Sequence, residues 1–269
     1  AWCERDGLLY WVDIWERRVY AGDEVLLQLD DYVGCLAPRR DGGLILTQSD
    51  GFYEWDARTH SVERMVAVEE PRGRRFNDGK CDPAGRFLAG CMDNEEKEAC
   101  GTLYSLAGRH VTPLLGGLSI PNGLTWSPDG KTFYFIDTPS RQVRAYEYDL
   151  STGQIPNGRT VISVPEELGW PDGMTSDTEG NLWIAMWGGA QVTQWDPADG
   201  RLLQSIPVPA LQTSSCIFGG PNLNELYITS ARTGMNREAL QKYPLSGGLF
   251  KLVTGVTGSP TYEFASIPE

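Results

Sequence analysis

The sequence predicts an all-β chain folded as a six-bladed β-propeller, and three observations support this class. A turn glycine followed by an apolar strand recurs through the chain, the strands alternate apolar and polar residues, and helical periodicity is nearly absent. Radial repetition of one four-strand unit explains how many short strands avoid exposed sheet edges. A β-sandwich is the competing all-β architecture, but it does not require six similar units.

The repeat has six copies, in chain order "DGLLYWVDI", "GGLILTQ", "AGRFLAG", "DGKTFYFID", "EGNLWIAMW" and "LNELYITSA". The intervals between marker residues are 36, 42, 45, 50 and 44, and the markers are Gly7, Gly43, Gly85, Gly130, Gly180 and Asn224. A second short strand follows most copies, as in "GFYEWD", "QVRAYEYD" and "QVTQWD". The whole chain, 1–269, is therefore expected to be one propeller domain without a linker. The one candidate helix is short and spans Met235 to Tyr243.

Composition limits the classes of partner. The net charge is 23 − 36 = −13, and no basic block is present, which argues against nucleic-acid binding. The sequence contains no run of 18 or more apolar residues, so no membrane span is predicted. The six cysteines form no C-x-x-C pair and only two histidines accompany them, so a structural zinc site is not expected. Cysteines within apolar segments are typical of free buried thiols, which favours a reducing, cytoplasmic location.

Three stretches repeat one pattern of chemical interest: "FNDGKCDPAGRFLAG", "PNGLTWSPDGKTFYF" and "PDGMTSDTEGNLWIA". Each begins a strand with an Asn or Asp near a glycine that lets backbones approach closely. Equivalent positions of successive blades point to one axis, so Asn77, Asn122 and Asp172 are expected to converge. Their oxygens suit a hard divalent cation. The alternative is that each pair is an ordinary turn dipeptide.

These stretches resemble the SMP-30/gluconolactonase/regucalcin family of six-bladed propeller lactonases. The resemblance is strongest in "RRFNDGKCDPAGRFLAGCM", "IPNGLTWSPDGKTFYFIDT" and "GWPDGMTSDTEGNLWIAMWGG", and it extends to "TSSCIFGGPNLNELYITSAR" and "GGLFKL". It runs the length of the chain. It implies the propeller fold and hydrolysis of a lactone with the help of one bound divalent metal ion.

The resemblance also implies roles for particular residues. Family members hold the metal through a Glu, an Asn and an Asp, and the Asn and Asp fall on Asn122 and Asp172. The family's substrate contacts, an Arg and an Asn in "RFND", fall on Arg75 and Asn77. A further acidic substrate contact falls on Glu95 in "GCMDNEE", and Glu96 is a close rival because this loop varies in length.

One family residue has no counterpart in the sequence. The metal-binding Glu of the family lies in a Glu-Gly-Pro motif just ahead of a Trp that Trp2 matches. This Glu is therefore expected a few residues before Ala1, in a first blade whose start is missing; the alternative is that the protein lacks this ligand, which would lower its metal affinity. Glu4 cannot replace it, because Glu4 follows the Trp and belongs to the next turn.

The predicted function is metal-dependent hydrolysis of a sugar-derived lactone, with Ca²⁺, Mg²⁺, Mn²⁺ or Zn²⁺ as the cofactor and a small-molecule sugar lactone as the partner. Asp172 is the candidate general base, and its alternative role is that of a ligand only. Arg75 can stabilise a developing oxyanion, or it can be a surface residue of the arginine cluster 72–75. Two other functions stay open: a non-catalytic calcium-binding regulatory propeller, and a related esterase or phosphotriesterase.

Overall fold

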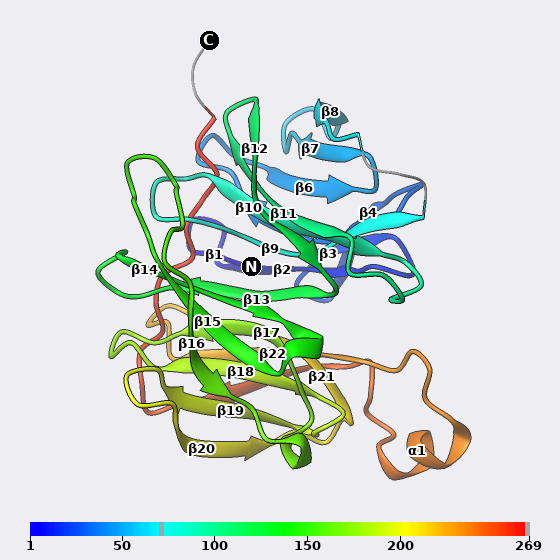
Figure 1. Cartoon of the computed structure of the whole chain (residues 1–269). Helices are drawn as coiled ribbons and strands as arrows, with labels where there is room; N and C mark the ends of the chain where they lie inside the picture. Colours follow the sequence, from blue (N-terminus) through cyan, green and yellow to red (C-terminus); the bar gives the residue numbers. More distant parts are fainter. Residues whose placement is uncertain (70–72, 267–269) are drawn as a thin grey trace. The chain divides into compact units, whose positions relative to one another are not determined.

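The computed structural model describes residues 1–69 and 73–266, so Arg72 of the arginine cluster lies outside the described residues. The chain is almost entirely β-structure, as predicted, and consecutive strands form antiparallel meanders (Figure 1). The contacts divide it into two compact units. The first unit comprises Ala1–Pro121, Asp149–Ile155 and the segment from Thr261 onward, and the second comprises Asn122–Tyr148 and Pro156–Pro260.

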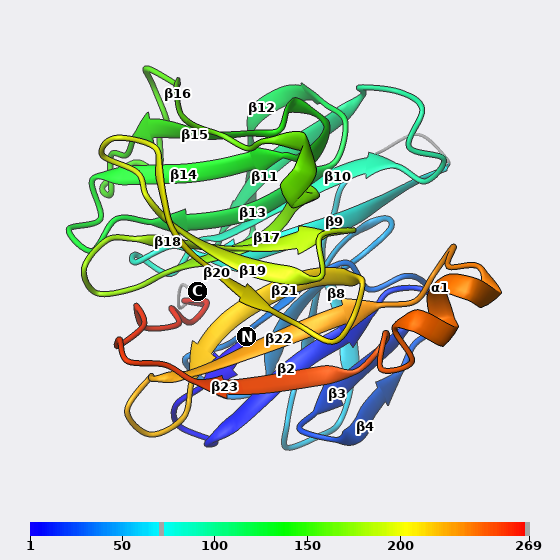
Figure 2. The same ribbon diagram turned by 90° about the horizontal axis from the view of Figure 1, so that it is seen from below.

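Three four-stranded sheets lie in the first unit, and each pairs its strands in sequence order. The first sheet contains β1 (Trp2–Cys3), β2 (Leu8–Asp13), β3 (Arg18–Ala21) and β4 (Glu24–Gln28). The second contains β5 (Leu36–Pro38), β6 (Leu44–Gln48), β7 (Gly51–Trp55) and β8 (Val62–Ala67). The third contains β9 (Arg74–Cys81), β10 (Phe87–Asp93), β11 (Gly101–Ala107) and β12 (His110–Leu118). Figure 2 shows β2, β3 and β4 side by side.

The second unit continues the repeat. Its first sheet contains β13 (Pro121–Trp126), β14 (Thr132–Asp137), β15 (Gln142–Glu147) and β16 (Arg159–Ser163). The next strands are β17 (Trp170–Ser176), β18 (Leu182–Trp187), β19 (Gln191–Asp196) and β20 (Arg201–Pro207). The last are β21 (Gln212–Gly219), β22 (Glu225–Ala231) and β23 (Leu249–Val253). One residue pair, Trp187 with Gln212, joins these last two groups into a seven-stranded sheet. The six predicted repeats are therefore all present as strand groups, although the last group has three strands among the described residues where four were predicted.

Helical structure is limited to short segments in the part of the chain that the structure describes. The predicted helix is confirmed as α1 (Arg237–Lys242), which Asn236 caps by accepting a hydrogen bond of 2.9 Å from the backbone nitrogen of Ala239. Two single-turn 3-10 helices, η1 (Thr138–Ser140) and η2 (Glu166–Leu168), follow β14 and β16. No helix among the described residues is long and apolar enough to cross a membrane.

Turn glycines mark the strand boundaries as the sequence predicts. All five marker glycines have positive φ, from 63° at Gly7 to 94° at Gly85. Glycine adopts this conformation without the steric cost that a Cβ imposes. In the sixth copy, where Asn224 replaces the glycine, the preceding Leu223 takes φ 51° instead.

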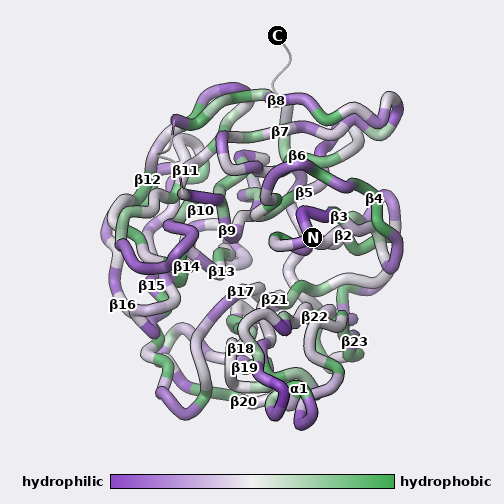
Figure 3. Tube along the Cα trace, turned by 90° about the vertical axis from the view of Figure 1, so that its right-hand side faces the viewer, coloured by the Kyte–Doolittle hydropathy of each residue, from purple (hydrophilic) through white to green (hydrophobic). Residues whose placement is uncertain are grey.

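Each unit has its own apolar cores, built from alternate strand residues. Figure 3 shows how hydrophobic and hydrophilic residues are distributed along the chain. In the first unit Phe52 packs against Phe76 and Phe87, with ring centroids 5.3 and 6.0 Å away. In the second unit Trp183 packs edge-on to Phe218. Five of the six cysteines are buried, Cys100 is partly exposed, and all six are free, as the sequence predicts.

Candidate functional site

Arg75 and Asn77 lie two residues apart on β9, so their side chains share one face of the strand. Arg75 is only 5% exposed, which excludes the surface role considered for it. Its Nη1 donates a hydrogen bond of 2.6 Å to Oδ1 of Asn77 and one of 3.2 Å to the carbonyl of Phe76. Asn77 in turn donates from Nδ2 to the carbonyl of Pro121 at 3.0 Å. The guanidinium is therefore held in a fixed position.

The structure separates the two acidic candidates of the loop after β10. Glu96 places a carboxylate oxygen 3.9 Å from Nη2 of Arg75. The Glu95 side chain is 70% exposed and pairs instead with Lys97 at 2.7 Å. The residue before the loop, Asp93, accepts backbone hydrogen bonds from Glu95, Lys97 and Glu98, at 3.3, 3.0 and 3.3 Å. Of the two carboxylates, Glu96 is thus the one beside Arg75.

These backbone hydrogen bonds also affect the charge of Asp93. The amide of Lys97, followed by that of Glu95, holds the pKa of the Asp93 carboxyl below its ordinary value, because N–H donors stabilise the ionised form. Glu96 itself has φ 57°, in the left-handed region. The backbone hydrogen bonds that Asp93 accepts from Glu95, Lys97 and Glu98 thus lie on both sides of Glu96 in the loop.

An exposed tryptophan adjoins Arg75 and was not identified from the sequence. Trp15, in the turn between β2 and β3, is 49% exposed, and its ring centroid lies 5.7 Å from Cζ of Arg75. It packs edge-on against Tyr32 with centroids 5.5 Å apart. Arg75 therefore has an aromatic ring, a carboxylate and an amide around it within the first unit.

In the second unit the two predicted metal ligands lie on strands of two different sheets. Asn122 is on β13 and Asp172 on β17, and each is the first strand of its group. The backbones approach closely, since a Cβ built on Gly123 would lie 2.6 Å from the carbonyl oxygen of Asp172. These Asn-Gly and Asp-Gly pairs lie within strands, so the alternative of turn dipeptides is wrong for both.

Thr138 connects the two strands and was also missed from the sequence. The buried Asn122 donates from Nδ2 to Oγ1 of Thr138 at 2.9 Å. The Thr138 hydroxyl donates to the carbonyl of Pro171, the residue before Asp172, at 2.8 Å. Because the Asn122 nitrogen is used in this way, the group that Asn122 can offer a cation is its oxygen, which is the atom that hard cations bind.

These two side chains thus fit the expected cation, because one offers an amide oxygen and the other a carboxylate, and their backbones approach closely. Within 1–69 and 73–266 no group of three or more His, Cys, Asp or Glu side chains forms a metal cluster. The predicted ligand set includes an amide, so it differs in kind from such a cluster.

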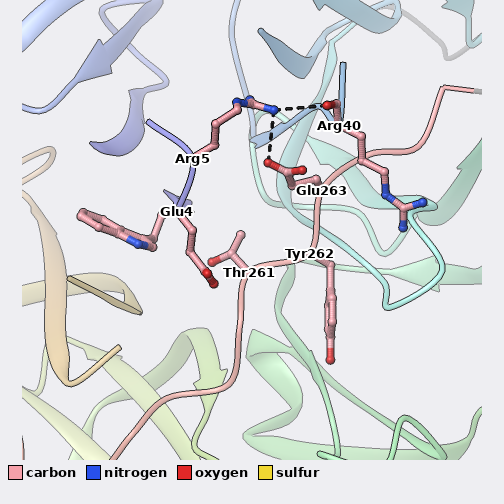
Figure 4. A pocket seen from close by; sticks show the side chains of 7 residues that line it. Glu4, Arg5, Arg40, Thr261, Tyr262 and Glu263 are labelled. Carbon is pink, nitrogen blue, oxygen red and sulfur yellow. Dashed lines mark hydrogen bonds and ion pairs between the residues drawn. The ribbon is translucent and has the colours of Figure 1, made fainter. Parts of the chain in front are cut away.

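A polar cavity of about 340 Å³ lies elsewhere in the first unit (Figure 4). Its lining residues are Trp2, Glu4, Arg5, Arg40, Thr261, Tyr262 and Glu263, and none of the predicted site residues is among them. Figure 4 shows that Arg5 contacts Glu263, at 3.6 Å, and the carbonyl of Arg40, at 3.3 Å. The charge of this arginine is therefore neutralised within the cavity wall.

Comparisons with known proteins agree with the fold. Regucalcin from Danio rerio is 40% identical over 273 residues, which cover 98% of this chain and 92% of that protein. The solved structure of a calcium-binding protein, regucalcin, from Agrobacterium tumefaciens matches all of this chain and 92% of its own, with 29% identity and a TM-score of 0.92. A gluconolactonase structure from Xanthomonas campestris matches 85% of this chain and 80% of its own, with 26% identity and a TM-score of 0.71.

The likeness to these structures extends over most or all of the chain, which agrees with the predicted fold class. A family model described as the SMP-30/Gluconolactonase/LRE-like region matches residues 1–232, more than half of the sequence. The predicted family is thereby confirmed: the chain belongs to the SMP-30/gluconolactonase/LRE-like family.

Proposed function

We propose that this protein hydrolyses a sugar-derived lactone with the help of one divalent cation bound through Asn122 and Asp172. The observation that carries the proposal is the fixed Asn122 amide beside the Asp172 backbone, since these two residues can offer a cation two oxygen ligands. The family supports this activity, because gluconolactonase is part of its name. The gluconolactonase from Xanthomonas campestris supports the same activity.

The proposed reaction opens the ring ester. A water oxygen attacks the lactone carbonyl carbon, the bond from that carbon to the ring oxygen breaks, and the product is a hydroxy acid. A divalent cation, when bound, polarises the carbonyl and increases the acidity of water. Asp172 accepts the proton of the attacking water and returns it to the departing ring oxygen.

Arg75 and Asn77 are the proposed substrate-binding residues. The guanidinium donates hydrogen bonds to substrate oxygens and stabilises negative charge, and its fixed position limits the entropy lost on binding. Asn77 accepts from Arg75 through its oxygen and donates through its nitrogen. We propose Glu96, in preference to Glu95, as the acidic substrate contact, since Glu96 is the one beside Arg75.

The test follows proton release during hydrolysis of several aldonolactones by the full-length protein. The protein is stripped with chelator and then titrated with Ca²⁺, Mg²⁺, Mn²⁺ or Zn²⁺. We expect turnover to return with metal and to vanish in Asp172→Ala. Absence of turnover on every lactone and with every metal would contradict the proposal.

A non-catalytic calcium-binding protein is the second candidate, because the Agrobacterium relative is described as calcium-binding. It predicts calcium binding without turnover. A related esterase or phosphotriesterase predicts higher initial rates on such esters than on lactones, so one substrate panel distinguishes the three functions. We further propose a cytoplasmic location, which the six free cysteines support.

A further inference from the structure

A buried hydroxyl lies between the two proposed metal ligands of the second unit. Thr138 is 9% exposed and begins η1, immediately after β14. It is 16 residues from Asn122 and 33 residues from Pro171 along the chain, yet it is hydrogen-bonded to both, at 2.9 and 2.8 Å. The hydroxyl therefore joins the side chain of one ligand to the backbone that precedes the other.

The direction of these two hydrogen bonds is determined by their chemistry. A threonine hydroxyl has one proton, and the carbonyl oxygen of Pro171 can only accept. The proton must therefore point to Pro171, and the Thr138 oxygen must accept from Asn122. An Asn amide can donate only through its nitrogen, so the nitrogen of Asn122 faces Thr138 and the oxygen lies on the opposite branch of the amide.

We propose that Thr138 is a positioning residue, which selects the amide orientation of Asn122 and holds the start of the Pro171–Asp172 segment beside it. This inference rests on the proposed function, because it requires a cation at Asn122 and Asp172. Groups that orient metal ligands typically change metal affinity by about 10- to 100-fold when removed. Thr138 would act in this way without touching the metal or the substrate.

The experiment compares Thr138→Val with Thr138→Ser in the full-length protein. Valine has nearly the shape of threonine but makes neither hydrogen bond, whereas serine keeps the hydroxyl. Binding of Ca²⁺ and Mn²⁺ is measured directly, by calorimetry and by electron paramagnetic resonance. We expect the Kd of Thr138→Val to rise about 10- to 100-fold, and that of Thr138→Ser to stay close to the parent value.

The chain offers a matched control on the same two strands. Thr125 on β13 is 5% exposed, and its hydroxyl lies 3.0 Å from that of Ser176 on β17. Thr125→Val therefore removes a comparably buried hydrogen bond that does not involve a ligand. We expect it to lower stability while the metal Kd is unchanged. Equal metal affinity in Thr138→Val and Thr125→Val would overturn the inference.

A second measurement needs no metal. The side-chain amide signal of Asn122 in ¹H–¹⁵N spectra, assigned by its loss in Asn122→Asp, should be sharp in the parent and in Thr138→Ser. It should shift or broaden in Thr138→Val, since the amide can then rotate; an unchanged signal would also overturn the inference. If Thr138→Val does not fold, Thr138→Ala is compared with Thr138→Ser in both assays.

Failure of the inference is distinct from failure of the proposed function. A parent protein that binds metal and turns over lactone, together with a Thr138→Val variant of unchanged affinity, contradicts the inference alone. A parent protein that binds none of the cations contradicts the proposed metal site, and the inference is overturned with it.

Discussion

Nη1 of Arg75 lies 2.6 Å from Oδ1 of Asn77, and both residues extend from the same face of β9. This hydrogen bond determines the orientation of both side chains. It fixes the guanidinium, and it also fixes the Asn77 amide, whose nitrogen then reaches the carbonyl of Pro121. A buried arginine that is bonded to a side chain and to the Phe76 carbonyl is costly to replace, because lysine cannot reproduce its fork of donors.

Arg75→Lys is therefore expected to impair lactone hydrolysis. A hydrogen bond to a charged group is worth about 1.5–3 kcal/mol, so kcat/KM should fall roughly 10- to 150-fold. The measurement is proton release under subsaturating lactone. Arg58→Lys is the control, since the Arg58 side chain is 87% exposed and pairs with Asp56 at the surface. Equal kcat/KM in the two variants would exclude a role for Arg75 in substrate binding.

Glu96 and Glu95 make a matched pair of adjacent carboxylates. Glu96→Gln removes the negative charge 3.9 Å from Arg75, and we expect KM to rise because the arginine loses a neighbour that orients it. Glu95→Gln removes an exposed pair with Lys97, which contributes little, and KM should not change. The measurement compares the KM of each variant with that of the parent protein, from initial rates. A rise confined to Glu95→Gln would restore the original assignment from the sequence.

The stability of the loop that carries Glu96 should depend on pH, because Asp93 titrates. The folded pKa of Asp93 is below its unfolded value of about 3.9. The ionised Asp93 carboxylate therefore stabilises the loop fully at pH values above the unfolded pKa. This stabilisation is lost as pH falls through the folded pKa. Hydrogen exchange should show protection of the Lys97 amide at pH 5 to 7 and its loss in more acidic solution.

A neutral variant gives the corresponding control for Asp93. Asp93→Asn keeps one acceptor oxygen but removes the charge that strengthens the backbone hydrogen bonds, so protection of the Lys97 amide should fall even at pH 7. Protection equal to that of the parent protein would show that the charge does not hold the loop.

Gly173→Ala is expected to destabilise the second unit. The new Cβ would lie 2.2 Å from Oγ and 2.7 Å from Cα of Ser215, so the strands must move apart. Overpacking of this kind costs typically 1–3 kcal/mol. Gly116→Ala on β12 is the control, because its Cβ would meet nothing within 4 Å. Denaturant unfolding compares them, and equal midpoints would contradict the close approach.

Much of the fold follows from local sequence patterns. A turn glycine and an alternating strand are properties of neighbouring residues, so "DGKTFYFID" indicates its own hairpin. The repeat then predicts that Asn122 and Asp172 occupy equivalent positions. The structure places each on the first strand of its group. The short helix was found in the same way, from its isolated helical pattern.

The parts of the site that the sequence did not predict depend on long-range or loop contacts. The choice between Glu95 and Glu96 depends on three amides that converge on Asp93 and on the left-handed backbone at Glu96. No local pattern encodes that arrangement. Thr138 follows "FID" at a strand end and looks like any turn residue, because its partners are distant in the chain.

The buried thiols give each unit a built-in reporter of its own opening. Cys35, Cys81 and Cys91 lie in an apolar core of the first unit, and Cys216 lies in one of the second. Burial raises the pKa of Cys35 and Cys81, so these thiols are not reactive thiolates in the folded chain. An alkylating reagent followed by peptide mass spectrometry would then time the loss of each core separately, residue by residue, without any engineered label.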